Sequence, residues 1–421
     1  MKIVPFQKKP DRSFLIKLPA LFLAVLATFS ACSGSNNTSS TPIPLPNGQA
    51  GSLITANGNR ADCFATTSST SPYLTLCTGS SPSAAGTNGV TALNTVSSAT
   101  TSPPPASLIV GTTNGNVNVV NSVYSSPTVS SYCQAGSSAI SAVAGVATSS
   151  SGANIFAASG NTLYGFTYSS SSSSCTDFNP PSISISSGTI TGLGIFNNVL
   201  FGVTSSGSYF TISGANTLNG LSSFATSLKP LPNYPVSGPA INGMAIDPNG
   251  LVFFADASTN TANNGGQITI YHVSSSTPYT LSPNNVQSYS GNNNGVAMSD
   301  PIGIAVSETT ITNPNYCSTA PCDYIYLLNI GNSIQQYVMP VPTPINGGVS
   351  INPFNLPYTG CEMTDPVALT SFPALNQLPF STQSQTGPFV FLGNKSLSSL
   401  GPCSGATTYG NNVVSYGITG Q

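Results

Sequence analysis

Two Asp-Pro pairs and an asparagine are the residues of this sequence best suited to holding a metal ion. Asp300 and Asp365 each precede a proline at the start of an apolar run, and Asn242 lies in a similar run. Carboxylate and amide oxygens are the ligands that Ca²⁺ prefers. One interpretation is therefore a Ca²⁺ site built from Asp300, Asp365 and Asn242. The other, which we favour, is that Asp-Pro caps a turn before a strand, with no cofactor bound.

The chain has a single histidine, His272, in an alternating stretch where Tyr271 and Val273 face the opposite way. A Ser-His-Asp triad would have to use this histidine, and no Gly-x-Ser-x-Gly motif accompanies it. We therefore expect no catalytic residue, and we interpret His272 as a solvent-facing or hydrogen-bonded strand residue.

The N-terminal segment 1–31 has the pattern of an export signal. Five basic residues precede the apolar run 18–29, which is too short to span a bilayer securely. The run ends in Phe29-Ser30-Ala31-Cys32, which resembles the lipobox of bacterial lipoproteins, although Phe29 replaces the usual Leu. This resemblance implies a lipid-modified Cys32 and, because Ser33 rather than Asp follows it, an outer-membrane lipoprotein. An ordinary secretory signal is the alternative.

The other eight cysteines form an even set, which in an exported chain favours disulfides. One of many possible connectivities pairs each cysteine with its nearest neighbour in the sequence. These disulfides would cross-link hairpins or neighbouring sheets. The pairs are Cys63–Cys77, Cys133–Cys175, Cys317–Cys322 and Cys361–Cys403. A zinc site is disfavoured, because no two cysteines have the spacing of a zinc knuckle.

A repeated unit positions these residues. Its best copy is the stretch 243–273, in which an apolar strand, the turn Asn249-Gly250, a second strand ending at Asp256 and a third strand follow one another. The first residues of such third strands are 117, 163, 209, 268, 334 and 413, so the spacing grows from 46 to 79 residues. Repeats of this length are typical of four-stranded propeller blades with loop insertions.

The predicted fold class is all-β, because no stretch after residue 31 has a helical apolar period. We expect a β-propeller domain at 52–421, after a Ser/Asn/Pro-rich disordered tether at 32–51. Six blades are visible, and small residues such as Gly243, Gly303 and Ala305 would suit the crowded innermost strands. Residues 52–107 are either a seventh blade or the source of an outer strand that completes the last blade.

The unit at 239–273, and less closely the one at 301–339, resembles the blades of NHL-repeat and gluconolactonase-like propellers, which carry Pro-x-Gly-Ile-Ala-Val-Asp-x-x-Gly-x-Leu-Tyr-Val-Ala-Asp. The chain has Ser307-Glu308 where the Asp is usual. The resemblance implies a propeller, and a divalent metal in its channel at the place suggested for Asp300 and Asp365.

Charge is sparse: after the signal, three basic residues stand against nine acidic ones, a net charge of about −6. Nucleic-acid binding is therefore not expected, because it needs clustered Lys and Arg.

The sequence predicts a lipid-anchored, exported β-propeller of the bacterial cell envelope, facing the periplasm or the cell surface. We expect it to act as a binding or scaffold module for protein or carbohydrate partners, through insertions near 274–299, 309–322 and 371–387. The alternative is a metal-dependent, lactonase-like hydrolase that uses channel carboxylates.

Overall fold

The computed structural model describes β-strands and many of their connections between residues 53 and 418. The described residues are 53–55, 63–66, 74–76, 89–97, 107–121, 128–186, 188–221, 228–234, 240–257, 265–283, 300–309, 319, 321–330, 333–340, 352–353, 366–372, 389–394 and 412–418. All of them belong to the second of the two units into which the chain divides, Asn36–Gln421. The predicted signal segment 1–31, the tether 32–51 and Cys32 lie outside the described residues.

Every regular element in the described ranges is a β-strand, which confirms the all-β prediction. Three sheets each consist of four antiparallel strands that follow one another along the chain. Their strands are β12 (Ile190–Phe196), β13 (Val199–Thr204), β14 (Ser208–Ser213) and β15 (Lys229–Pro230); β16 (Ile241–Ile246), β17 (Leu251–Asp256), β18 (Gln267–Val273) and β19 (Leu281–Pro283); β20 (Pro301–Thr309), β21 (Cys322–Asn329), β22 (Ser333–Pro340) and β23 (Asn352–Pro353). Within these same ranges, no helix is long and apolar enough to cross a membrane.

An eight-stranded sheet contains two further sets of four consecutive strands. They are β4 (Val90–Ser97), β5 (Leu108–Thr112), β6 (Asn116–Asn121) and β7 (Thr128–Gln134), and β8 (Ala142–Ala147), β9 (Gly152–Ser159), β10 (Thr162–Ser169) and β11 (Ser174–Ser184). Each set is antiparallel. The two sets are joined by a short parallel pairing of β4 with β8, at Val96↔Gly145 and Ser97↔Val146.

The remaining sheet brings together strands from both ends of the chain. Its strands are β24 (Pro366–Phe372), β25 (Phe389–Asn394), β26 (Asn412–Ile418), β1 (Leu53–Thr55), β2 (Cys63–Thr66) and β3 (Leu74–Leu76). β26 pairs on one side with β25 and on the other with β2 and β1. Of the two sequence-based alternatives for residues 52–107, the pairings of β1 and β2 match the one in which this segment supplies an outer strand to the last sheet, whereas β4 of the same segment is the innermost strand of the first set.

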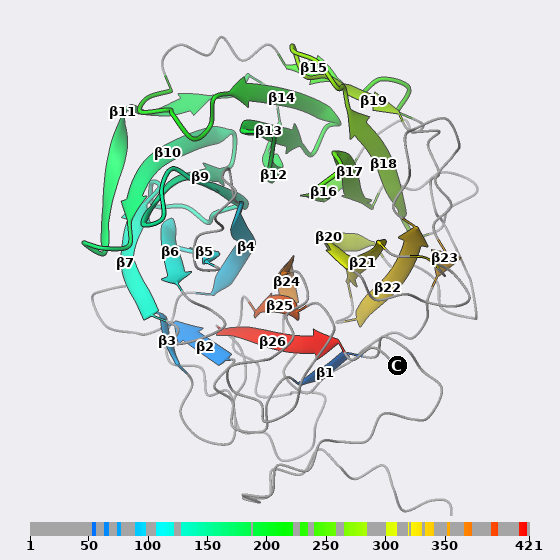
Figure 1. Cartoon of the computed structure of the whole chain (residues 1–421), viewed down its shortest axis with the longest axis horizontal. Helices are drawn as coiled ribbons and strands as arrows, with labels where there is room; N and C mark the ends of the chain where they lie inside the picture. Colours follow the sequence, from blue (N-terminus) through cyan, green and yellow to red (C-terminus); the bar gives the residue numbers. More distant parts are fainter. Residues whose placement is uncertain are drawn as a thin grey trace, which may run out of the picture. The chain divides into compact units, whose positions relative to one another are not determined.

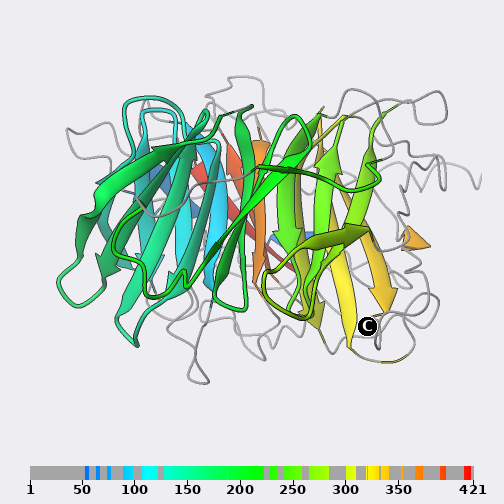
Figure 2. The same cartoon turned by 90° about the horizontal axis from the view of Figure 1, so that it is seen from above.

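The innermost strands of these sheets form a closed ring (Figure 1). Each of β4, β8, β12, β16 and β20 contacts the next in this order, β20 contacts β24, and β24 contacts β4. Seen from above, the inner strands run roughly along the ring axis, and the outer strands are inclined to it (Figure 2). The described strands therefore have the architecture of a β-propeller.

The repeat found in the sequence corresponds to this architecture strand by strand. The predicted anchors of the third strands are all in the third strand of their set: 117 in β6, 163 in β10, 209 in β14, 268 in β18, 334 in β22 and 413 in β26. The predicted opening strands at 241, 301 and 366 are β16, β20 and β24. Second strands such as β13, β17 and β21 are buried along their whole length, because sheets pack on both of their faces.

Small residues allow the innermost strands to approach one another. A Cβ atom on Gly243 in β16 would lie 3.3 Å from the Cα atom of Gly303 in β20. A Cβ atom on Gly192 in β12 would lie 2.5 Å from Cβ of Met244. The predicted role of Gly243 beside the crowded channel is thus confirmed.

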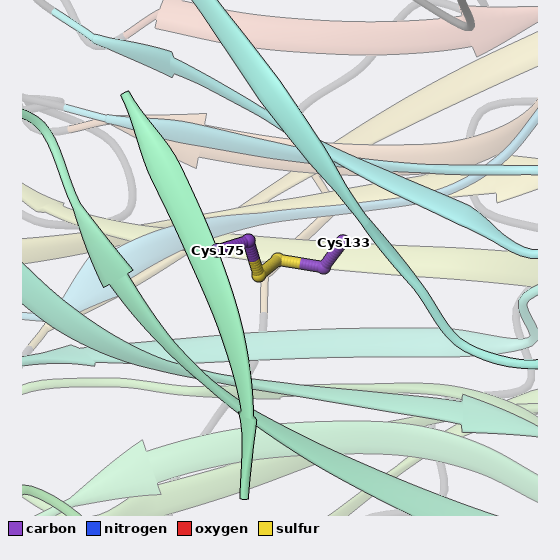
Figure 3. The surroundings of a disulfide bond; sticks show 2 residues. All are labelled: Cys133 and Cys175. Carbon is purple, nitrogen blue, oxygen red and sulfur yellow. A yellow bond between two sulfur atoms is a disulfide. The ribbon is translucent and has the colours of Figure 1, made fainter. Parts of the chain in front are cut away.

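One of the predicted disulfides joins two neighbouring sets of strands. Cys133 in β7 and Cys175 in β11 are bonded, with their Cα atoms 5.4 Å apart (Figure 3). Both are on the fourth, outermost strand of their set, so the bond links the outer edges of the two sets. Cys322 is also disulfide-bonded. Its predicted partner Cys317, the side chain of Cys63, and Cys77, Cys361 and Cys403 lie outside the described residues, so these three pairings stay predictions.

Candidate functional site

The channel enclosed by the inner strands is narrow and has no charged lining among the described residues. Its volume is about 60 Å³, and its walls are apolar side chains, glycines, hydroxyls and two amides, Asn94 and Asn242. The Asn94 side chain donates to the carbonyl oxygens of Val143 at 2.8 Å and Leu193 at 3.0 Å, which ties β4 to β8 and β12. Pockets for small organic ligands are usually about 300–1,000 Å³. The channel is therefore better suited to holding the sheets together than to enclosing a substrate.

The structure brings together two of the three residues that the sequence suggested as metal ligands. Asn242 lines the channel and donates its amide to the carbonyl oxygen of Pro301 at 2.9 Å. Asp300 precedes that proline, is exposed, and has a positive φ of 42°. Asp365 is outside the described residues. The three-residue Ca²⁺ site thus remains a prediction, and the described contacts give Asn242 a role in joining β16 to β20.

His272 lies in β18 opposite Leu251 of β17 and is partly exposed, while Tyr271 and Val273 are buried. This confirms the predicted alternation. The Nδ1 atom of His272 is buried and accepts or donates no hydrogen bond within the described residues.

A different group of acidic side chains converges at the other end of the inner strands. The first member, Asp247, follows β16 and organises the turn to β17. Its Oδ1 atom accepts hydrogen bonds from the backbone N–H groups of Asn249 at 2.9 Å and Leu251 at 2.6 Å. Gly250 takes the left-handed conformation, with φ of 86°, that the predicted Asn-Gly turn requires. The turn therefore fixes the Asp247 carboxylate beside the next sheet.

The other two members come from that next sheet. Glu308 near the end of β20 and Asp323 near the start of β21 are cross-strand partners in an antiparallel pair. One carboxylate oxygen from each of Asp247, Glu308 and Asp323 lies within 4.8 Å of the others. Asn249 joins the group through its side-chain amide, which donates to Glu308 Oε2 at 2.6 Å and to Asp247 Oδ2 at 3.2 Å. We call these four residues the inter-sheet carboxylate cluster.

Burial makes this cluster electrostatically unusual. Asp247 and Asp323 are 2% and 0% exposed, and Glu308 is half-buried. Burial raises the pKa of Asp323 well above its usual range, and the charge of Asp247, a hydrogen bond with the Asp247 carboxyl and the charge of Glu308 raise it further. Burial also raises the pKa of Asp247, although hydrogen bonds from Leu251 and Asn249 oppose the change. Lys229, the sole lysine or arginine within the described ranges, is in β15 of a different sheet.

The hydrogen bonding of Asp323 differs from that of the other fully buried aspartate. Asp256 at the end of β17 accepts hydrogen bonds from the Tyr234 hydroxyl and, at 2.7 Å, from the Gln267 amide. Both carboxylate oxygens of Asp323 are buried, and apart from the Asp247 carboxyl, which is close enough for a shared proton, no described group offers either of them a hydrogen bond. Buried carboxylates normally have donors or a cation beside them. Two kinds of partner would satisfy Asp323, a proton shared with Asp247 or a bound cation.

The sequence contained a signal for this cluster that the sequence analysis did not use. Asp247 comes directly after the apolar run of β16, and Glu308 comes one position later in β20, after Ser307. Asp323 is the second residue of β21, which pairs with β20 in the same sheet. The Asp-Pro pairs at 300 and 365 lie at the opposite end of the inner strands, so they do not indicate that three acids converge between neighbouring sheets.

Comparisons with known proteins give similarity in structure alone. No protein-family model matches the chain, and no curated protein matches it in sequence. Solved structures of WD40-type β-propellers resemble it, with 10% sequence identity in each case. Raptor of Chaetomium thermophilum has a TM-score of 0.41, and the match covers 89% of this chain but 28% of Raptor. Sqt1 of Saccharomyces cerevisiae has a TM-score of 0.39 with 78% and 72% covered, and U3-55K one of 0.40 with 74% and 77% covered. The expected membership in the NHL-repeat or gluconolactonase-like group has no matching family model.

Proposed function

We propose that this chain is an exported, lipid-anchored β-propeller of six blades that serves as a binding or scaffold module. The observation that carries the proposal is the closed ring of inner strands around a channel of about 60 Å³, whose lining has no charged side chain in the part of the chain that the structure describes. Such a core gives a rigid support, and it leaves recognition to the segments that connect the strands. The six-blade count rests on the six sets of consecutive strands, the last of them completed by β2.

The proposed lipid anchor and the proposed cellular location rest on features of the sequence. The basic and apolar segment 1–31 would direct export, Cys32 would carry the lipid, and the tether 32–51 would hold the propeller away from an outer membrane. The Cys133–Cys175 disulfide supports an oxidising compartment, since disulfides persist there and are rare in the cytosol.

The partner is a protein or a carbohydrate, contacted through the long insertions. The predicted insertion 274–299 contains β19, so its connecting part begins after residue 283. The ends of the other two, 309–322 and 371–387, belong to β20, β21 and β24. The segments 284–299, 310–318 and 373–388 are the ones we assign to partner binding. Their uncharged polar composition suits hydrogen bonding to peptide groups or sugar hydroxyls.

A loop exchange tests the binding function. Residues 284–299 are replaced by a Gly-Ser segment of equal length, and the unmodified chain and the variant are compared for binding to envelope proteins and to a glycan array. We expect a partner that binds the unmodified chain and loses at least tenfold in affinity on the exchange, with no change in melting temperature. The same Gly-Ser replacement of residues 373–388 shows, by comparison of the two losses in affinity, which of the two segments contributes more to binding. Turnover of lactones or esters by the unmodified chain, abolished by Asn242→Ala, would instead establish the hydrolase alternative.

The anchor has its own test. Cys32→Ala in the producing cell is expected to move the chain from the membrane fraction to the soluble exported fraction. Retention of the variant in the membrane fraction would contradict the lipid-anchor assignment. The loop exchange is informative under either outcome.

A further inference from the structure

The inter-sheet carboxylate cluster has a ligand set that favours one class of ion. It offers oxygen atoms only, from three carboxylates and one amide, with no histidine or cysteine in the group. Hard cations such as Ca²⁺ prefer such ligands, whereas zinc and copper favour nitrogen and sulfur. Two ligands of one Ca²⁺ ion, each about 2.4 Å from it, are at most about 4.8 Å apart. The carboxylate oxygens meet this limit without any movement of the chain.

The unsatisfied state of Asp323 is the independent sign of a missing partner. Its side chain is 0% exposed, and apart from the carboxyl of Asp247 no described group offers a hydrogen bond to either carboxylate oxygen. A proton shared between Asp323 and Asp247 would satisfy one of these oxygens. It would leave the second Asp323 oxygen without a donor, and it would not account for the approach of Glu308 from the same sheet. A divalent cation would satisfy all three acids at once.

Asn249 explains how the cluster can exist without the ion. Its exposed side-chain amide donates hydrogen bonds from the NH₂ group to Glu308 and Asp247. The NH₂ group thus carries its partial positive charge next to the two carboxylates. A rotation of the amide by 180° exchanges the NH₂ group for the oxygen, which would then face the same space. The side chain can therefore donate to the two carboxylates without the ion and coordinate the ion when it is present.

From these contacts we propose that Asp247, Glu308 and Asp323, with the side-chain oxygen of Asn249, bind one Ca²⁺ ion between the sheets β16–β19 and β20–β23. The ion would connect neighbouring sheets at the ends of their inner strands, where Asn249 and Glu308 already form a hydrogen bond between the sheets. The site differs from the suggested channel site, since it shares no residue with Asn242, Asp300 and Asp365. It is also independent of the proposed binding function.

Calorimetric titration of the full chain with CaCl₂, after treatment with a chelator, tests the proposal. We expect about one ion bound per chain with a Kd on the order of 10⁻⁴ M. At 100 times that Kd the melting temperature should rise by about 3 °C. Asp323→Asn should abolish the heat of binding. It should also leave the melting temperature in chelator equal to or above that of the unmodified chain, because a buried charge has been removed.

Matched variants keep the test decisive. Asp177→Asn makes the same chemical change on the exposed strand β11 and should bind Ca²⁺ like the unmodified chain. Glu308→Gln changes a half-buried residue, so it should fold even if Asp323→Asn does not, and its affinity should fall at least tenfold. Absence of binding and of any Ca²⁺-dependent shift in melting temperature would leave a proton-sharing carboxyl pair and overturn the proposal. Tighter binding of Mg²⁺ than of Ca²⁺ would overturn the assignment of the ion.

Discussion

Tyr324 carries a hydroxyl group that the fold places in the interior without a partner. The residue follows Asp323 in β21 and is 0% exposed, and its hydroxyl has no hydrogen bond within the described residues. Burial raises the pKa of this phenol to about 12. An unsatisfied buried hydroxyl costs about 1–3 kcal/mol relative to a satisfied one. Tyr271 differs, because its hydroxyl donates to the carbonyl oxygen of Pro232 at 3.0 Å.

Tyr324→Phe is accordingly expected to stabilise the protein, by about 1 kcal/mol in the free energy of unfolding measured with denaturant. A second effect appears at high pH. The raised pKa favours the neutral phenol in the folded state, so this contribution to stability is present below pH 10 and is lost as the pH rises toward 12. The variant should therefore lose less stability than the unmodified chain between pH 10 and pH 12.

Tyr271→Phe is the matched control, because it removes a hydroxyl that has a partner and should destabilise the chain at neutral pH. A loss of stability at neutral pH with Tyr324→Phe would show that this hydroxyl has a hydrogen-bond partner, and would contradict the prediction.

At the scale of the element, aromatic rings packed on glycines fix the pairing of neighbouring strands. Gly202 in β13 is the cross-strand partner of Phe210 in β14, and a Cβ atom on Gly202 would lie 2.1 Å from the ring. Gly165 in β10 is covered in the same way by Phe178 of β11, where the Cβ distance would be 2.3 Å. The ring fills the space that a side chain would need. The Gly202–Phe210 pair therefore specifies which residues stand opposite each other, while Phe178 covers Gly165 at the register shift between β10 and β11.

Gly202→Ala should destabilise the protein by about 1–3 kcal/mol, because the added methyl group overlaps the Phe210 ring and the core has no room to relax. Gly303→Ala is the matched substitution in another strand. Its Cβ atom would meet neighbours at 3.7 Å, an ordinary contact, so the change should be small. Thermal unfolding of both variants gives the comparison. Equal stability of the two would contradict the assigned role of the Phe210 ring.

Strand positions were predictable from the sequence because the repeat is local. Asn249-Gly250 and the alternating run at 267–273 specify a turn and a strand by themselves, and both are present in the structure. The inter-sheet cluster was not predictable in this way. Asp247 and Asp323 are 76 positions apart and meet only because β16 and β20 become neighbours in the ring. The hydrogen bond of Asp256 was not predictable from a local pattern either, since its partner Tyr234 comes from a loop before β16.

At the scale of the whole molecule, closure depends on strands at opposite ends of the chain. β26 pairs with β2 at Cys63↔Val414 and with β1 at Leu53↔Ile418. The remaining sheets are made of strands that are close in sequence. Within the described ranges, the outer edge of β26 is therefore covered by β1 and β2.

A chain that begins at residue 78 lacks β1, β2 and β3 and should expose the edge of β26. Exposed edges pair with other chains, so we expect this truncation to self-associate and to melt at a lower temperature. Size-exclusion chromatography with light scattering measures the association. A chain that begins at residue 52 keeps all three strands and is the control. If the two truncations have the same mass and melting temperature, the pairing of β26 with the N-terminal strands does not stabilise the ring.

This long-range pairing also sets the order of events during folding. Leu53 and Ile418 are 365 residues apart, so β1 and β2 leave the ribosome long before their partner β26 has been synthesised. Contacts of such large sequence separation form late and slow the overall folding rate. An incomplete chain has unpaired strands at both ends, which makes it a substrate for chaperones and proteases until the ring closes. Opening of the closed ring at this sheet has to separate β26 from β1 and β2, segments that synthesis placed far apart.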